Sequence, residues 1–193
     1  MMIVIKFILY MCVALVALVD LVLLIKLIEY GWCVLIRHQA PFVPSNRYLR
    51  AAVVHELKTY YPHARRILEI GSGYGGLTRY ITRHTGAMAV GVENMPMSAF
   101  LSTMADWTCP GARTVWADAF QYMKSGEKFD IAMAYLGPKL TPRLADFRSC
   151  FDVLILMDFQ LHGVRPVRVV DLNCGCVRYG GKKYPHRLYI YEF

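Results

Sequence analysis

The sequence predicts an α/β fold with a mostly parallel sheet, helices on both faces of that sheet, an antiparallel C-terminal hairpin, and an N-terminal transmembrane helix. Residues 65–158 alternate short apolar segments with amphipathic ones, which is the pattern of strands joined by helices. Residues 165–193 hold two alternating segments with no helical segment between them, which indicates a hairpin. Residues 7–25 are almost entirely apolar. We therefore divide the chain into a membrane anchor with a juxtamembrane helix, 1–36, and a globular domain, 37–193.

The apolar segment FILYMCVALVALVDLVLLI, residues 7–25, is long enough to cross a bilayer. As a helix it would extend roughly 28 Å, about the thickness of a hydrocarbon core. Its one charge, Asp20, lies toward the C-terminal end, where water or headgroups can reach the carboxylate; a functional acid inside the membrane is the alternative. A cleaved signal peptide is a second alternative, because Lys6 precedes the segment. We favour a permanent anchor, since the run is long for a signal peptide.

Basic residues around the apolar segment predict its orientation. Lys6 alone precedes the segment, and four basic residues follow it: Lys26, Arg37, Arg47 and Arg50. The positive-inside tendency then places the globular domain on the cytoplasmic side, or on the equivalent side of an organelle membrane.

The globular part carries the whole net charge of the chain, which is +8. This excess suits a domain beside an anionic lipid surface or one that binds an acidic partner. No nucleic-acid-binding motif accompanies the charge, and we expect no nucleic-acid partner. The six cysteines follow no disulfide or metal-binding spacing, so we expect reduced, packed thiols and no metal site.

The globular domain is expected to begin with a linker and a helix. Residues 37–46, RHQAPFVPSN, contain two prolines and are typical of an extended linker. Ser45 is the expected N-cap of the helix. Apolar residues then recur at helical spacing and stop before Pro62: Leu49, Val53, Leu57 and Tyr60.

The remaining elements follow in an order typical of a parallel sheet. Their strand segments are continuously apolar, as in sheets that are covered on both faces. The expected strands are residues 65–71, 88–94, 114–118, 129–136 and 151–158, and the expected helices are 77–86, 97–107 and 140–147. The hairpin strands are expected at 165–172 and 186–193, joined through the basic, glycine-rich segment RYGGKKYPHR.

The segment GSGYGG, residues 71–76, leaves the first strand of the expected sheet and opens the following helix. Ligands of open parallel sheets bind beyond the carboxyl ends of the strands, so this loop is the expected binding site. Glycines let the backbone approach a ligand, and the first amides of a helix favour a negative group. A dinucleotide pyrophosphate, the methionine end of S-adenosylmethionine, and a flexible turn without a ligand are all compatible with the loop. The expected ligand contacts are Gly71, Ser72, Gly73, Tyr74 and Gly75.

Acidic residues at the ends of the first three strands favour a cationic adenosyl ligand. Glu69 would repel a pyrophosphate but could hold the ammonium of a methionine moiety. Glu93, which Asn94 follows, has two oxygens that can accept both hydroxyls of a ribose. Asp118, which Ala119 follows, is placed to accept the amino group of adenine. The alternatives are a strand-end acid for Glu69, a surface acid for Glu93, and the N-cap of a following helix for Asp118.

These motifs resemble those of the class I S-adenosylmethionine-dependent methyltransferases, which have a Rossmann-like sheet. The resemblance rests on EIGSGYGG, GVEN, the dipeptide AD at 117–118 and the closing hairpin, and it covers residues 37–193. A narrower resemblance adds the apolar N-terminal span, PFVPS, GVENMP and AYLGP. These segments are similar to the membrane-anchored lysine methyltransferase family that modifies the adenine nucleotide translocase and the ATP synthase c-subunit.

The narrower resemblance implies a protein-lysine N-methyltransferase that uses S-adenosylmethionine and acts on a protein in or beside the membrane. It also implies that the N-terminal segment is the membrane anchor. The glycine loop of that family usually reads D-L-G-S-G-D-G-R. Glu69 is a conservative departure from it, whereas Tyr74 and Gly76 replace an acid and a base. These departures bear on the substrate rather than on the cofactor.

Methyl transfer to an amine requires alignment and exclusion of water more than it requires a strong base. A lysine ammonium must first lose its proton, and a pocket of low polarity favours this by lowering the lysine pKa. We expect the segment AYLGP to form the pocket floor, with Tyr135 as the catalytic residue that faces the amine; core packing is the alternative for Tyr135. Phe42 and Pro44 are expected to close over the cofactor. The six histidines lie on the linker, helix faces or loops, and none is assigned a catalytic role.

Three other functions are compatible with the sequence. A methyltransferase for a small-molecule or lipid-like substrate, such as a quinone, would use the same site. A nicotinamide-binding oxidoreductase would use Gly71, Gly73 and Gly76, which match G-x-G-x-x-G, but Glu69 and the lack of a second substrate domain argue against it. A membrane scaffold with a decayed cofactor fold would not need acids at three strand ends.

Overall fold

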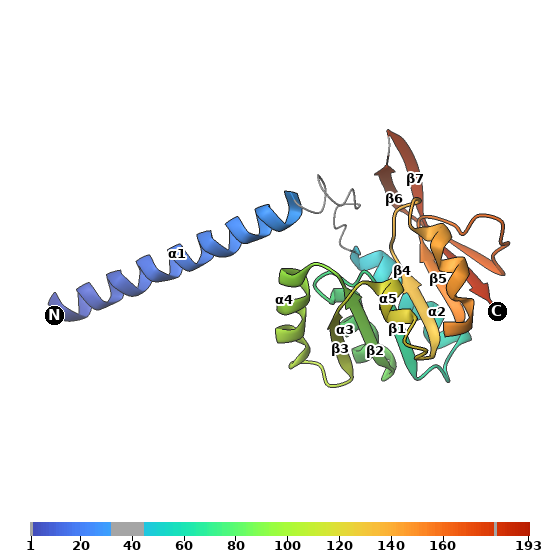
Figure 1. Ribbon diagram of the computed structural model, residues 1–193, viewed down its shortest axis with the longest axis horizontal. Coiled ribbons are helices and arrows are strands. Elements are labelled where there is room, and N and C mark those ends of the chain that lie inside the picture. Colours follow the sequence, from blue (N-terminus) through green and yellow to red (C-terminus); the bar gives the residue numbers. More distant parts are fainter. Residues whose placement is uncertain (1, 32–44, 180) are drawn as a thin grey trace. The chain divides into compact units, whose positions relative to one another are not determined.

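A computed structural model describes residues 2–31, 45–179 and 181–193 of the chain (Figure 1). The chain forms two compact units, Met1–Pro41 and Phe42–Phe193. The predicted boundary between residues 36 and 37 lies outside the described residues.

The described part of the first unit is the helix α1, which runs from Met2 to Gly31. It extends beyond the predicted span of 7–25 at both ends, and none of its residues is buried. The helix is long and apolar enough to cross a membrane. A signal sequence near an N-terminus shares these properties, so both predictions for the segment are compatible with the structure.

The first described helix of the second unit is α2, Arg47–Tyr60. It begins one residue later than the predicted N-cap, Ser45, implies. Asn46 caps this helix, because its side-chain oxygen accepts the Leu49 N–H at 2.8 Å. Ser45 does not cap it; the Ser45 hydroxyl oxygen instead accepts the Arg50 Nε–H at 2.9 Å. The helix ends before Pro62 as predicted.

The second unit has a seven-stranded sheet with the order β3-β2-β1-β4-β5-β7-β6 (Figure 1). Strands β1 to β5 are parallel, and β7 is antiparallel to both β5 and β6. This confirms the predicted α/β fold with a C-terminal antiparallel hairpin. The strands are β1 Arg66–Ile70, β2 Met88–Glu93, β3 Ala112–Trp116, β4 Phe129–Ala134, β5 Phe151–Met157, β6 Arg168–Tyr179 and β7 Lys182–Glu192.

Helices cover both faces of this sheet, as the continuously apolar strands predict. Successive β1 side chains point to opposite faces of the sheet. Ile67 packs on one face with α2 and α3, Gly76–Thr85. Leu68 packs on the other face with α5, Ala119–Met123, and the 3₁₀ segment η2, Thr141–Cys150. The helix α4, Pro96–Asp106, packs against β3. The carboxyl ends of β1 to β5 are thereby left at one edge of the sheet.

Several predicted strand boundaries are wrong, and those of β3 and of the hairpin bear on the site. Strand β3 ends at Trp116 and not at residue 118, because Asp118 caps α5. The hairpin strands extend into the predicted connecting segment, and Pro185 pairs with Cys176 inside them. Proline is tolerated there because β7 pairs with β5 only from Leu188 onward, so this part of the hairpin is a two-stranded ribbon beyond the main sheet.

Tyr191 allows a test of the core on the η2 side of the sheet. Its ring is 1% exposed, and its hydroxyl oxygen accepts the N–H of buried Leu161 at 2.8 Å. In Tyr191→Phe this N–H loses its partner, and we expect the free energy of unfolding of the full chain in detergent to fall by about 1–3 kcal/mol. Tyr60→Phe, at a half-exposed position, is the control and should change it by less than about 0.5 kcal/mol. Equal urea midpoints for the two variants would contradict this account of Tyr191.

Candidate functional site

The glycine loop leaves β1 in a tight, hydrogen-bonded turn. The N–H groups of Gly71 and Ser72 both donate to the Val92 carbonyl, at 2.9 and 3.1 Å, which joins the loop to the end of β2. Gly71, Gly73 and Gly75 have φ values of +74°, +55° and +65°, in the left-handed region that disfavours a Cβ atom. The course of the loop therefore requires glycine, and its backbone geometry is more defined than that of a flexible turn.

Glu93, the last residue of β2, holds this loop from below. Its carboxylate is buried and accepts the Gly73 N–H at 2.7 Å and the Met95 N–H at 2.8 Å, one on each oxygen. The surface-acid alternative for Glu93 is therefore wrong. Each carboxylate oxygen has two acceptor positions, so the two backbone bonds are compatible with additional hydroxyl donors. The neighbouring Asn94 is half-buried, and its carbonyl accepts the Trp116 indole N–H at 3.3 Å.

Glu69 is a second buried carboxylate below the loop. It lies one residue before the end of β1 and accepts a hydrogen bond from the Thr78 hydroxyl in the first turn of α3. Burial raises the pKa of Glu69 to about 7; the Thr78 hydrogen bonds and the Arg50 charge oppose this rise, and the Glu93 charge adds to it. Burial thus favours the protonated form of Glu69 when no ligand is bound.

The side chain of Ser72, a residue of the loop, packs against Gly91 of β2. Its hydroxyl is buried and has no hydrogen-bond partner among the described residues. This close packing depends on Gly91 in β2, because a Cβ atom there would lie 2.6 Å from the Ser72 Oγ and 2.7 Å from the Thr78 Oγ1.

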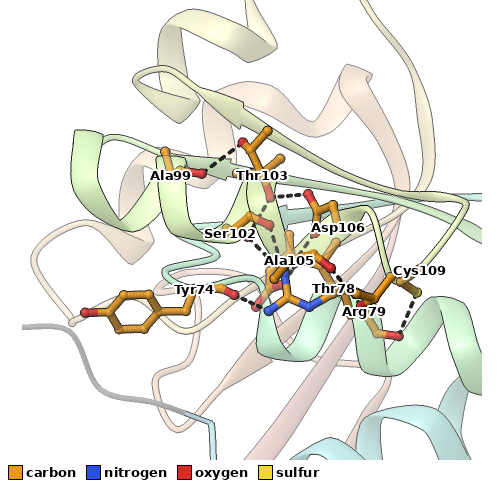
Figure 2. A network of polar contacts seen from close by, with 12 residues as sticks. Tyr74, Thr78, Arg79, Ala99, Ser102, Thr103, Ala105, Asp106 and Cys109 are labelled. Atoms are coloured by element: carbon orange, nitrogen blue, oxygen red, sulfur yellow. Dashed lines mark hydrogen bonds and ion pairs between the residues drawn. The ribbon is translucent and has the colours of Figure 1, made fainter. Parts of the chain in front are cut away.

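A polar network fixes the outer part of the loop (Figure 2). The Arg79 guanidinium, from α3, donates to the Tyr74 carbonyl and forms a 2.9 Å ion pair with Asp106 of α4. Asp106 also accepts the Thr114 hydroxyl of β3 at 2.7 Å. The loop is thereby joined to α3, α4 and β3 at once, while the Tyr74 side chain itself is 38% exposed.

Asp118, which follows β3, is the N-cap of the next helix, as the alternative for this residue stated. It is exposed, and its Oδ1 accepts the Gln121 N–H at 3.0 Å as the N-cap of α5, in which Ala119 is the first residue. Glu69 and Glu93 lie near or at the ends of β1 and β2, and Asp118 follows β3; the three strands are adjacent and parallel. Contact of Asp118 with adenine stays a prediction.

The predicted catalytic residue lies just beyond β4. Tyr135 follows the last strand residue, Ala134, and is half-buried against the core on the α2 and α3 face of the sheet. Its partial packing agrees with the core-packing alternative, and its role toward a substrate stays a prediction. Phe42 and Pro44, the predicted lid, lie outside the described residues.

Arg50 is a site residue that the sequence analysis missed. It lies in the first turn of α2, and its guanidinium covers the start of α3, where a Cβ on Gly76 would lie 2.8 Å from an Arg50 nitrogen. Its charge also acts on Glu69. Helical periodicity could not identify Arg50, because its position depends on how α2 packs against α3.

The sequence analysis also missed a histidine–aspartate pair at the same edge. His186 lies in β7, and its Nδ1 is 2.9 Å from the Asp158 Oδ2. Asp158 follows β5, is 3% exposed, has a left-handed φ of +66°, and also accepts the Arg187 N–H. A carboxylate on Nδ1 fixes the imidazole orientation, which leaves Nε2 as the nitrogen that can accept a proton. The sequence signal for this pair is weak, because the two residues meet only through the β5–β7 pairing.

The arrangement favours binding of a ligand with a cationic amino group close to a carboxylate. Glu69 and Glu93 are buried carboxylates below the loop, and the Arg50 guanidinium lies beside Gly76 at the start of α3. In the described ranges, no group of three His, Cys, Asp or Glu side chains is placed to hold a metal ion.

Comparison with known proteins supports the fold. No protein-family model matches the chain. The polyamine aminopropyltransferase 1 of Hyperthermus butylicus is 29% identical over 108 residues, which cover 48% of this chain and only 37% of that protein.

Solved structures are similar over most of the chain. An RNA methyltransferase of Salinibacter ruber, in complex with S-adenosyl-L-homocysteine, has a TM-score of 0.63 and 19% identity, with 78% of this chain and 93% of that one covered. A precorrin-6y C5,15-methyltransferase of Geobacter metallireducens has a TM-score of 0.54 and 14% identity, covering 79% and 91%. TrmK of M. capricolum, in complex with S-adenosylhomocysteine, has a TM-score of 0.56 and 11% identity, covering 72% and 67%. The second unit therefore has the class I methyltransferase fold.

The raised pKa of Glu69 predicts a pH dependence of stability. Its pKa is about 7 in the folded protein and about 4.5 when unfolded, so between these values the folded state holds a proton that the unfolded state has lost. Stability should therefore fall by up to about 3 kcal/mol as the pH rises through this window. Urea unfolding of the ligand-free chain at several pH values measures this fall.

Glu69→Gln cannot ionise and should lose most of this pH dependence. The exposed acid Asp146 provides the matched control, since Asp146→Asn should keep the wild-type slope. Identical slopes for wild type and Glu69→Gln would show that the pKa of Glu69 is not raised.

Proposed function

We propose that the second unit binds S-adenosylmethionine and transfers its methyl group. The observation that carries this proposal is the pair of buried carboxylates, Glu69 and Glu93, below a loop whose backbone geometry requires glycine at 71, 73 and 75. Buried carboxylates favour a cation above them. The methyltransferase fold, which neighbours with bound S-adenosylhomocysteine share, supports the proposal.

Each part of the donor has a residue suited to hold it. Glu69 would hold the ammonium of the methionine moiety, and Arg50 would hold its carboxylate. Glu93 would accept the ribose hydroxyls, and Asp118 the adenine amino group. Glu69 would then ionise on binding, because the ammonium replaces the proton that burial keeps on it.

We further propose that the acceptor is a lysine of a protein in or beside a membrane, with α1 as the anchor. An anchor raises the effective concentration of a membrane substrate without adding affinity in the site. The lysine must become neutral before it attacks, and Tyr135 would line its path. His186 is suited to take up the proton at Nε2, since Asp158 stabilises the imidazolium that forms. The donor supplies an electrophilic methyl group on its sulfonium.

Two other functions are distinguishable from this one. The relative from Hyperthermus butylicus favours aminopropyl transfer as a second candidate, but the match covers only 37% of that protein. A nicotinamide-binding oxidoreductase would place a pyrophosphate beside Glu69, where like charges repel.

Ligand binding tests the proposed donor. We expect S-adenosylhomocysteine to raise the melting temperature of the full chain in detergent and NAD to leave it unchanged. Glu93→Ala should abolish the shift, because the loop loses both its support and its ribose partner, whereas Asp146→Asn should keep it. A shift produced by NAD and not by S-adenosylhomocysteine would contradict the proposal.

Mass spectrometry of membrane proteins tests the proposed acceptor. In cells that carry the gene we expect a lysine species heavier by one methyl group that disappears when the gene is deleted. The species should return with the wild-type gene and not with Glu93→Ala. If methylation is lost from a small molecule or lipid instead, the lysine proposal is wrong while the methyltransferase proposal holds.

The same assay tests His186. His186→Gln should reduce the methylated species and keep the thermal shift with S-adenosylhomocysteine, because the side chain acts on the acceptor and not on the donor. Undiminished methylation with His186→Gln would remove the histidine from the mechanism.

A further inference from the structure

The helix α4 buries small and polar residues and exposes large apolar ones. Its buried residues are Ser98, Ala99, Ser102 and Asp106. Its exposed apolar residues are Phe100, Leu101 and Met104, followed by Trp107 directly after the helix. A helix on the surface of a water-soluble domain has the opposite pattern.

The exposed residues form one continuous face. Phe100, Met104 and Trp107 recur at helical spacing and are 60%, 52% and 82% exposed. Trp116 extends this face onto the edge strand β3: it lies two residues after Thr114, whose hydroxyl bonds Ser102 and Asp106 of α4, so both point to the α4 side of the sheet. The Trp116 ring is 68% exposed. We call this set, Phe100, Leu101, Met104, Trp107 and Trp116, the α4 apolar face.

The polar residues on the inner side of α4 are explained by their contacts with Arg79. These contacts do not explain the large apolar residues on its outer side. Ser102 and Asp106 bind Arg79, which in turn holds the Tyr74 carbonyl of the glycine loop (Figure 2). Support of the loop therefore requires polar residues toward the domain. Nothing in the packing of the domain requires Phe100 or Trp107 on the other side.

We propose that the α4 apolar face contacts the interface of a lipid bilayer. Helices of this kind lie in the plane of the interface, with Trp, Phe and Leu buried roughly 5–10 Å into the boundary between headgroups and acyl chains. The charges agree with an anionic surface, because the one acid of α4, Asp106, is buried and paired. At the C-terminal end of α4, exposed Arg83 donates to the Thr108 hydroxyl at 3.1 Å, which places a cation beside Trp107.

A bilayer fits this face better than a second copy of the chain, and this step rests on the proposed anchor. The chain between Gly31 and Arg47 reaches at most roughly 55 Å when fully extended. With α1 in a membrane, the domain would therefore always lie close to that membrane, whereas a second copy would have to be encountered. Contact through α4 would also hold the glycine loop near the headgroups, because Arg79 links the two.

Tryptophan fluorescence of the full chain in nanodiscs of phosphatidylcholine and phosphatidylglycerol tests this proposal. The chain has three tryptophans, and Trp32→Phe with Trp116→Phe leaves Trp107 as the reporter. We expect blue-shifted Trp107 emission and strong quenching by lipids with brominated acyl chains. Bromine near the glycerol end of the chains should quench more than bromine near the methyl end. Gln121→Trp in a background without other tryptophans is the control, since α5 lies on the other face of the sheet and should remain unquenched.

Loss of the apolar face should release the domain without unfolding it. Phe100→Gln with Met104→Gln changes only exposed side chains, and Trp107 quenching should fall to the level of the Gln121→Trp control while the circular dichroism spectrum is unchanged. The proposal is overturned if Trp107 and the control are quenched equally, or if Trp107 is not quenched. Extraction of vesicles with alkaline carbonate reports on α1 separately. If carbonate releases the chain, while Trp107 is quenched in vesicles at neutral pH before extraction, the anchor is refuted and the α4 contact is retained.

Discussion

Two carboxylates buried below one glycine loop are the constraint on which the carboxyl edge of this sheet depends. Glu93 accepts the N–H of Gly73 in the loop and the N–H of Met95, which follows β2, so β2 and the loop hold one geometry together. The Glu69 carboxylate is stabilised less, by one hydrogen bond from the Thr78 hydroxyl and by the charge of Arg50. Burial of an ionised carboxylate without a close counter-charge is costly, and this is why Glu69 keeps its proton near neutral pH.

The same constraint extends outward to α4. The loop carbonyl at Tyr74 is held by Arg79, which needs an acid, and Asp106 supplies it from α4. Asp106 is satisfied further by Thr114 in the edge strand. A chain of polar contacts thus links the centre of the sheet to its edge, and it leaves the small, polar side of α4 inside and its large apolar residues outside.

The sequence predicts those features that depend on local patterns. Strands β1, β2 and β5 follow from apolar runs ended by glycine or an acid, and the end of α3 follows from Gly86. Local patterns fail where two adjacent residues can play one role, as with Ser45 and Asn46, or where pairing lengthens a strand, as in β6 and β7. Arg50 and His186 could not be predicted because their partners come from other elements, which tertiary packing alone brings together.

A glycine turn without a ligand would have no reason to keep such acids. Burial of a carboxyl group that no cation compensates is unfavourable, so a fold without a ligand would gain nothing from Glu69. The chain instead retains an acid whose pKa burial raises to about 7. Its ionisation is unfavourable in the ligand-free fold and becomes favourable once a cation lies above it. Binding of an ammonium group would therefore relieve the cost of ionising Glu69 and so favour the bound state.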